Sequence, residues 1–232
     1  MRLALKIVGA LLLIYLIAVV IVDGPKIYRA LYPTPALKAK LQKEQVERLK
    51  VAISENAKDI FRNPNDAVAG NPDGDITVVE FFDYNCGHCK SSLADVVMLV
   101  KSDPNVRVVL KELPILSKGS QEASRVALAA RSQGKYWEMH RALLEAPGRA
   151  NKASALKLAE GLGFDMEQLK ADMGSDEVKA EIARAEVLAQ KIGVTGVPSF
   201  VVGDRVMFGS ANLYEQLSSH VDELRKHGCS YC

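Results

Sequence analysis

The hydrophobic and polar positions change period several times along the chain, and each change predicts a different element. Residues 7–22 are apolar at every position and follow the basic residues Arg2 and Lys6. An apolar run near the start of a chain is typical of an export signal or a membrane anchor. Its end has no small-x-small cleavage pattern. Of the two, we therefore expect residues 1–25 to be an uncleaved signal anchor rather than a removed signal sequence, with residues 3–22 in the membrane.

A polar helical stretch follows this apolar run. Residues 36–61 are rich in Lys, Glu, Gln, Leu and Ala, which predicts a helix. Its apolar positions are sparse, but Val46, Ile53 and Ile60 stand seven apart, as in a short heptad seam. Two interpretations remain open for the predicted linker 26–63. It is either a helix that joins copies of the chain or a solvated spacer.

The period changes again after turn clusters at 63–66 and 71–75. Residues 76–82 are almost continuously apolar and rich in β-branched side chains, which predicts a central strand buried on both faces. A helix that begins at Cys86 is expected next, and a second strand at 106–112. This strand-helix-strand unit predicts two parallel strands.

Helical patterning then fills residues 121–192, where glycines divide it into several short helices. Strand character returns at 199–202 and, after a glycine-containing turn, at 205–208, which predicts an antiparallel hairpin. A final amphipathic helix has apolar positions at Leu213, Leu217, Val221 and Leu224. We therefore predict an α/β domain at 64–228 with a helical insertion at about 118–192.

Composition narrows the range of functions. The chain has 232 residues, of which 48% are hydrophobic and 25% charged, so a folded domain is expected rather than disorder. A formal net charge of +2 provides no concentrated basic face, and nucleic acid is not expected as a partner. The 4 cysteines form two C-x-x-C pairs, which is not the disulfide framework of a small fold.

The first pair, Cys86 and Cys89, has the setting that thiol-disulfide exchange requires. Such exchange needs a thiolate and a second thiol that resolves the mixed disulfide. Cys86 opens the predicted helix, whose free N–H groups stabilise a thiolate, and Cys89 follows one turn later. His88 can stabilise the Cys86 thiolate by charge or by a hydrogen bond. No cofactor or metal is expected, although a C-x-x-C alone could also be half of a zinc site.

Two motifs resemble the DsbA-like branch of the thioredoxin-fold proteins, FFDYNCGHCK at 81–90 and TGVPSF at 195–200. The likeness covers about residues 64–226. It implies a thioredoxin-like fold in which the helical block is the family's insertion. It also makes Pro198 a cis-proline that faces the cysteines, and gives the backbone of Val197 the role of pairing with an extended substrate segment.

The resemblance implies roles for further residues near the cysteine pair. Gly87 would lie at the substrate-binding surface. Glu80 stands where this family often keeps a buried acid, which would transfer protons to and from Cys89; the alternative is a strand carboxylate exposed to solvent. Asp83 and Lys90 are expected at the rim, solvated.

The direction of electron flow is open. DsbA oxidases usually carry proline where this chain has Gly87, and Cys-Gly-His-Cys is typical of protein disulfide isomerases, whereas Val197 favours the oxidase type. The helical extension at 36–61 resembles that of ScsC-type members, where it makes oligomers. We expect a dithiol oxidase. The alternatives are an oligomeric isomerase or reductase kept reduced by a membrane donor and, from another class, a non-catalytic metal-binding envelope module.

The resemblance also implies a location and partners. The domain would be periplasmic or in the cell envelope, and the apolar run predicts that residues 3–22 anchor it to the inner membrane. Its substrates would be reduced or misoxidised exported proteins, and its redox partner a DsbB-like or DsbD-like membrane protein. Association of copies through 36–61 would make a homo-oligomer.

The second cysteine pair, Cys229 and Cys232, lies in the tail at 229–232, beyond the family pattern. Four interpretations remain open for it. The pair could form a local disulfide, relay electrons to the first pair, bind metal together with His227, or remain as free thiols.

Overall fold

The computed structural model describes residues 34–209, 211–229 and 231. The chain divides into two compact units, Met1–Arg48 and Leu49–Cys232. The predicted signal anchor at 1–25 lies outside the described residues. Within the described ranges, no helix is both long enough and apolar enough to span a bilayer.

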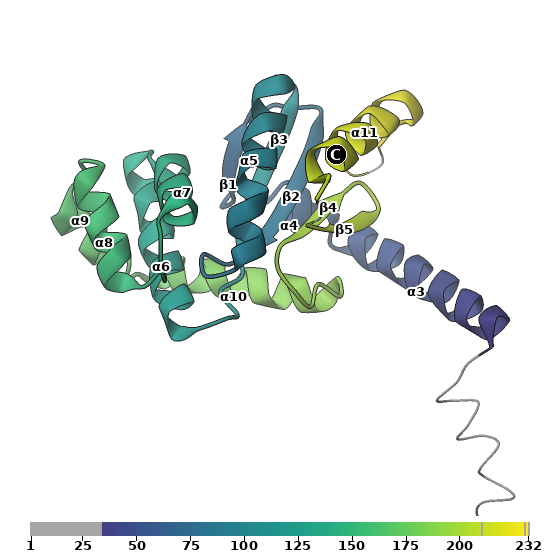
Figure 1. The fold of residues 1–232 in the computed structure, drawn as a ribbon, viewed down its shortest axis with the longest axis horizontal. Coiled ribbons are helices and arrows are strands. Elements are labelled where there is room, and N and C mark those ends of the chain that lie inside the picture. Colours follow the sequence, from purple (N-terminus) through teal and green to yellow (C-terminus); the bar gives the residue numbers. More distant parts are fainter. Residues whose placement is uncertain (1–33, 210, 230, 232) are drawn as a thin grey trace, which may run out of the picture. The chain divides into compact units, whose positions relative to one another are not determined.

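A five-stranded sheet of order β1-β3-β2-β4-β5 forms the centre of the second unit (Figure 1). Its strands β2 and β3 pair in parallel, and the other neighbours are antiparallel. Every residue of β2 and β3 is buried, which explains why β2 is almost continuously apolar, although β3 also buries Arg107, Lys111 and Glu112. The predicted parallel unit and the hairpin are both confirmed. The strands are β1 (Ala67–Gly70), β2 (Ile76–Phe82), β3 (Val106–Glu112), β4 (Ser199–Val202) and β5 (Arg205–Phe208).

Strand β1 was not predicted from the sequence. It has four residues, Ala-Val-Ala-Gly, and lies at the edge of the sheet, antiparallel to β3. Small side chains in so short a strand leave no alternation to detect.

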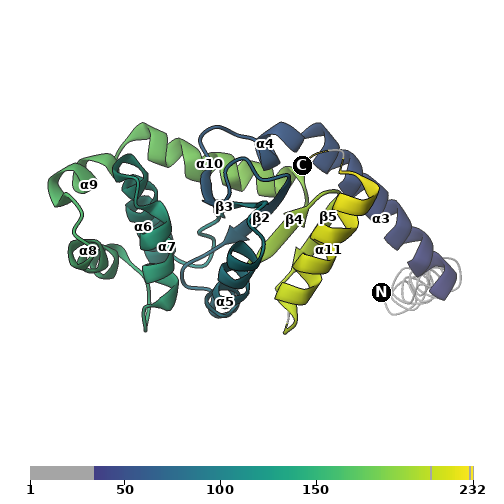
Figure 2. The same ribbon diagram turned by 90° about the horizontal axis from the view of Figure 1, so that it is seen from above.

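Helices cover both faces of this sheet. Figure 2 shows α5 and α11 on one face and α4 and α10 on the other. The predicted insertion at 118–192 contains α6 to α10, as several short helices, and a 3-10 turn. The helices are α3 (Pro35–Glu55), α4 (Ala57–Phe61), α5 (Gly87–Ser102), α6 (Lys118–Ala129), α7 (Tyr136–Glu145), α8 (Lys152–Gly161), α9 (Met166–Asp172), α10 (Asp176–Lys191) and α11 (Leu213–His227), with the 3-10 turn at Ala130–Gln133.

The alternation of side chains along β2 separates two apolar cores. Val78 and Phe82 pack in the same cluster as Val96 of α5, whereas Val79 and Phe81 belong to the cluster on the α10 side. Glu80 has the same parity as Val78 and Phe82, so strand geometry directs it towards α5. Burial of each large apolar side chain contributes roughly 1.5–3 kcal/mol to stability.

The predicted helix at 36–61 is interrupted. Asn56 separates α3 from α4, and its Nδ2 atom donates to the carbonyl oxygen of Ala52 at 2.8 Å. Ile53 and Ile60 are fully buried in the core on the α10 side, while Val46 is 43% exposed. Two of the three heptad positions therefore pack inside the second unit, and the interpretation of all three as one free seam is wrong.

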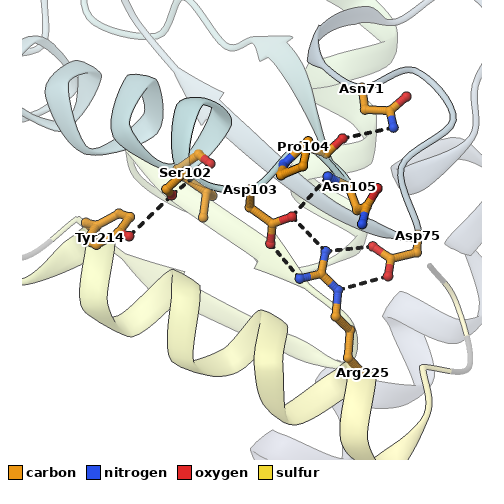
Figure 3. Close-up of polar contacts among 9 residues, drawn as sticks. Asn71, Asp75, Ser102, Asp103, Pro104, Asn105, Tyr214 and Arg225 are labelled. Atoms are coloured by element: carbon orange, nitrogen blue, oxygen red, sulfur yellow. Dashed lines mark hydrogen bonds and ion pairs between the residues drawn. The ribbon is translucent and has the colours of Figure 1, made fainter.

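Arg225 connects α11 to the turn before β2 and to the C-terminal end of α5 (Figure 3). Its guanidinium donates to both carboxylate oxygens of Asp75, at 2.8 and 2.9 Å, and to both of Asp103, at 2.5 and 3.1 Å. Asp103 is the C-cap residue of α5. One side chain thereby fixes α11 to the end of α5 and to the residue just before β2.

Candidate functional site

The loop 83–85 leads from β2 to Cys86, the N-cap residue of α5. Cys86 has extended backbone angles, φ −81° and ψ 119°. Its Sγ atom donates a hydrogen bond to the carbonyl oxygen of Val197 at 3.3 Å. Cys86 is 7% exposed, and the next two residues, Gly87 and His88, are exposed. The thiol therefore lies at the outer end of α5, where first-turn N–H groups have no partner within the helix.

Cys89, one helical turn later, has no exposed surface. Burial raises the pKa of its thiol far above the ordinary value, and a backbone hydrogen bond at Asp83 lowers it only in part. The charge of Glu80 and a hydrogen bond with the Cys86 thiol raise the pKa of Cys89 further. Both thiols are free. The pair thus joins an outer thiol to an inner one that favours its protonated form.

Glu80 is 1% exposed, so the alternative of a solvated strand carboxylate is wrong. Burial raises the pKa of its carboxyl group to about 8, and a hydrogen bond from Ser92 opposes this shift. The Ser92 hydroxyl lies 3.4 Å from Glu80 Oε1. Glu80 therefore carries a proton at neutral pH, close to the buried thiol.

The peptide bond between Val197 and Pro198 is cis, as the resemblance implied. Pro198 is buried and Val197 is half-buried. The Ser199 hydroxyl donates to the carbonyl oxygen of Gly196 at 2.7 Å and so closes this turn. The turn and Cys86 meet through the bond from the thiol to Val197, which brings the two predicted motifs together.

Gly209, just after β5, supports the same turn and was not predicted. A Cβ atom at this position would lie 2.7 Å from Cγ of Pro198. The Gly209 N–H donates to the Pro198 carbonyl oxygen at 3.4 Å. Only a glycine allows the backbone to approach the proline ring this closely. Glycine is a common turn residue after a hairpin, so this contact could not be predicted from the sequence.

The expectation that Asp83 and Lys90 are solvated at the rim is wrong for Asp83, whereas Lys90 stays partly exposed. Asp83 is fully buried, and its carboxylate accepts from the backbone N–H of Asn85 at 2.7 Å and of Leu116 at 2.9 Å. These two bonds compensate its burial and fix the loop before Cys86. Lys90 is half-buried, and its ammonium group donates to backbone carbonyl groups of the insertion.

Another buried acid, Glu112 at the end of β3, was also missed. Its Oε1 atom accepts from the hydroxyl groups of Tyr84 and Tyr136, both at 2.8 Å, and its Oε2 atom from Ser124 at 2.7 Å. Burial raises the pKa of Glu112 to about 7. Tyr84 belongs to the loop before Cys86, so this cluster connects that loop to α6 and α7.

The second cysteine pair is described only in part. Cys229 is disulfide-bonded, and Cys232 lies outside the described residues. Pairing of Cys229 with Cys232 therefore stays a prediction. In the portion of the chain that the structure describes, no three or more His, Cys, Asp and Glu side chains are grouped so that they could hold a metal ion.

Comparison with known proteins identifies relatives of this domain. The family of DSBA-like thioredoxin domains matches residues 77–222. The thiol:disulfide interchange protein DsbA of Pseudomonas aeruginosa is 31% identical over 159 residues, which are 65% of this chain and 75% of that protein. A Salinispora arenicola protein named Na(+)/H(+) antiporter NhaA 1 is 32% identical over 190 residues. That match covers 80% of this chain, but the chain spans only 29% of the antiporter's length.

Solved structures agree with this result. A thioredoxin-like oxidoreductase from Silicibacter pomeroyi is 51% identical and superposes with a TM-score of 0.70, over 73% of this chain and 97% of that one. A linker-deletion variant of Proteus mirabilis ScsC superposes with a TM-score of 0.76, over 88% of this chain and 95% of that one. Because its identity is 21%, it supports the fold alone. The predicted thioredoxin-like α/β fold with a helical insertion is confirmed.

Proposed function

This chain belongs to the family of DSBA-like thioredoxin domains, and on that premise we propose that it is a dithiol oxidase that donates its Cys86–Cys89 disulfide to other proteins. The observation that carries the proposal is the difference between the two thiols. Cys86 lies at the outer end of α5, beside Val197, whereas Cys89 is enclosed next to a buried acid. In this arrangement a substrate thiolate can reach and attack the sulfur of Cys86, and the sulfur of Cys89 is the leaving group.

In the first step, a substrate thiolate attacks Sγ of Cys86 in the disulfide form. The Cys86–Cys89 bond breaks, and its electron pair goes to Sγ of Cys89. A mixed disulfide between the substrate and Cys86 forms.

The sulfur of Cys89 then needs a proton. As a thiolate it would be a buried charge. Burial disfavours this charge, and the pKa of Cys89 is raised for that reason. Glu80, whose pKa is about 8, holds a proton at neutral pH. We assign to Glu80 the delivery of this proton, after which the carboxylate regains one from solvent. Reoxidation would use the same groups in reverse.

In the second step, the other thiolate of the substrate attacks the substrate sulfur of the mixed disulfide. The bond to Cys86 breaks, and Cys86 leaves as a thiolate at the N-terminus of α5. The substrate dithiol loses two electrons and two protons. One proton ends on Cys89 and the other in solvent, so the protein is left reduced, with Cys86 as the thiolate and Cys89 as the thiol.

Substrate segments would bind beside the cis-proline turn. The backbone of half-buried Val197 already accepts a bond from Cys86, so an extended chain paired with it would reach the thiol. Exposed Gly87 and His88 complete this surface. We further propose that substrates are reduced exported proteins in the cell envelope, and that a DsbB-like membrane protein reoxidises the pair.

The direct experiment follows the oxidation of a reduced protein substrate. Cys86→Ser and Cys89→Ser should each abolish it, because neither variant can form the Cys86–Cys89 disulfide that the substrate thiolate attacks. The matched control replaces Cys229 and Cys232 by Ser and should retain activity. Oxidation at the unmodified rate by Cys86→Ser would refute the assignment.

An oligomeric isomerase is the second candidate, favoured by the Cys-Gly-His-Cys sequence and by helix α3 before the domain. Because Ile53 and Ile60 belong to the core, the deletion that tests it should remove residues 36–48 only. An isomerase should then lose its repair of scrambled disulfides and fall in mass by light scattering. An oxidase should keep its oxidation rate.

A further inference from the structure

Two side chains that flank the cysteine motif bind the same loop of the helical insertion. Asn85 directly precedes Cys86, and Lys90 directly follows Cys89. The loop, residues 146–150, connects α7 to α8. The segments are far apart in the sequence, but α7 packs against α5.

The amide of Asn85 pairs with the backbone of one residue of this loop. Its Oδ1 atom accepts from the N–H of Ala150 at 2.8 Å, and its Nδ2 atom donates to the carbonyl oxygen of Ala150 at 2.9 Å. Nδ2 also lies 3.0 Å from the Ser120 hydroxyl and 3.3 Å from the Ser117 hydroxyl. The residue before Cys86 is thereby held by two separate segments of the insertion.

Lys90 holds the other end of the loop. Its Nζ atom donates to the carbonyl oxygen of Ala146 at 2.7 Å and to that of Gly148 at 3.2 Å. Ala146 is the C-cap residue of α7, where an ammonium group is also favoured by the helix dipole. The backbone N–H of Lys90 donates to the carbonyl oxygen of Cys86 at 3.1 Å. The same residue therefore contacts both the loop and the start of α5.

We propose that Asn85 and Lys90 form a clamp through which the helical insertion sets the orientation of Cys86, so that both act as positioning residues for the reacting thiol. The side chain of Cys86 makes no capping hydrogen bond to α5, and the extended backbone of Cys86 depends on the segment before it. Asp83 holds the backbone of Asn85, and Ala150 holds its side chain. This inference rests on the proposed function only in taking Cys86 as the thiol that reacts.

The clamp variants are Asn85→Ala and Lys90→Met, and the chain offers a matched control for each. Asn151 follows Ala150, but its side chain caps α8 by accepting from Ser154 N–H at 3.1 Å. Asn151→Ala therefore disturbs the insertion without touching the clamp. Lys135 also bridges two backbone carbonyl groups, those of Gly163 at 3.0 Å and Leu162 at 3.5 Å, within the insertion alone. Lys135→Met removes an equivalent contact elsewhere.

The test measures the rate at which iodoacetamide alkylates Cys86 as a function of pH. It uses the reduced full chain with Cys229 and Cys232 replaced by Ser. Only the thiolate reacts, so the profile reports how well the site stabilises that form. Both clamp variants should shift the profile in the same direction and lower the rate about threefold or more at pH values below the midpoint. The alkylation profiles of both control variants should superimpose on that of the unmodified protein.

Amide hydrogen exchange at Ala150 supplies the second readout, since its N–H is a bond donor in the clamp. Exchange should accelerate in Asn85→Ala and stay unchanged in Lys135→Met. A shift of the alkylation profile in Lys90→Met alone would reflect the lost charge of the lysine and would refute the proposed clamp. Profiles in both clamp variants that match the unmodified protein would also refute it. Alkylation needs no disulfide substrate. Failure of the unmodified protein to oxidise substrates would therefore refute the proposed function and leave this test intact.

Discussion

Glu80 and Cys89 lie close together in one buried layer between β2 and α5, where the charge of Glu80 raises the pKa of the thiol. The Ser92 hydroxyl lies 3.4 Å from Glu80 Oε1 and 3.0 Å from the carbonyl oxygen of Cys89. Two acids in a closed, poorly solvated space resist being charged together. We therefore expect the protonation of Glu80 to be coupled to the redox state of the cysteine pair.

Glu80→Gln should slow the exchange because the amide cannot deliver a proton to Cys89. The rate of mixed-disulfide formation with glutathione should fall about tenfold or more at neutral pH. The ratio of the unmodified rate to the Glu80→Gln rate should decrease as pH rises through about 8, where the wild-type carboxyl group loses its proton. Stopped-flow measurements across this range give the ratio. The control is Glu112→Gln, which alters another buried acid, and an equal loss there would contradict a specific role for Glu80.

Glu112 should make stability depend on pH. Its pKa of about 7 in the folded protein lies above its ordinary 4.5, so the folded state binds the extra proton between these values. The corresponding stabilisation is complete below pH 4.5 and is lost as pH rises through about 7. The loss should amount to roughly 3 kcal/mol. Urea unfolding at several pH values gives the slope of the unfolding free energy against pH. Glu112→Gln should remove the contribution of Glu112 to that slope. Glu145→Gln, at an exposed acid, should leave the slope unchanged.

Gly209→Ala should disturb the cis-proline turn, because the new Cβ would meet the rigid ring of Pro198 at 2.7 Å. We expect a loss of stability of about 1–3 kcal/mol and slower oxidation of a protein substrate. Gly161→Ala is the matched control, since a Cβ there has no neighbour within 4 Å. That control should be neutral or slightly stabilising in its helix. Equal thermal midpoints for the two variants would show that the close approach is unimportant.

Arg225→Ala should loosen α11, which Arg225 attaches to Asp75 and Asp103 (Figure 3). The side chain of Arg225 is 27% exposed, so we expect a loss of only about 1 kcal/mol, smaller at high salt. Arg225→Lys should recover less than half of it, because an ammonium group cannot form both paired contacts. The control is Arg205→Ala, because the ion pair of Arg205 with Glu223 is about half exposed. This substitution should lower the stability by almost nothing. Chemical denaturation of the three variants compares these costs.

The sequence predicted those elements whose apolar pattern reports their position in the fold. An almost continuous apolar run marked β2 because that strand is buried on each face, and β3 was predicted as the strand that follows the helix. Strand β1 carries small side chains at the edge of the sheet and left no such pattern. The break at Asn56 was missed for a related reason, since the surrounding residues favour helix and only packing of Ile60 in the core redirects the chain.

The residues of the site likewise fall into those that the sequence predicted and those that it could not. A C-x-x-C at the start of a predicted helix indicated Cys86 and Cys89, and the resemblance added Glu80 and Pro198. The contacts that hold the cysteine loop depend on partners distant in the sequence. Asn85 and Ala150, for example, are 65 positions apart. Such pairs are set by the tertiary fold, so a pattern confined to one segment cannot reveal them.

The most direct test of the account is the redox equilibrium of Cys86 and Cys89 against glutathione, measured with Cys229 and Cys232 replaced by Ser. A donor of disulfides should have a reduction potential above about −200 mV, because its dithiol form is the more stable one. We predict such a value, and we predict that Cys86→Ser removes the transition. A potential near −270 mV, about that of thioredoxin, would contradict the oxidase and favour a reductase or isomerase.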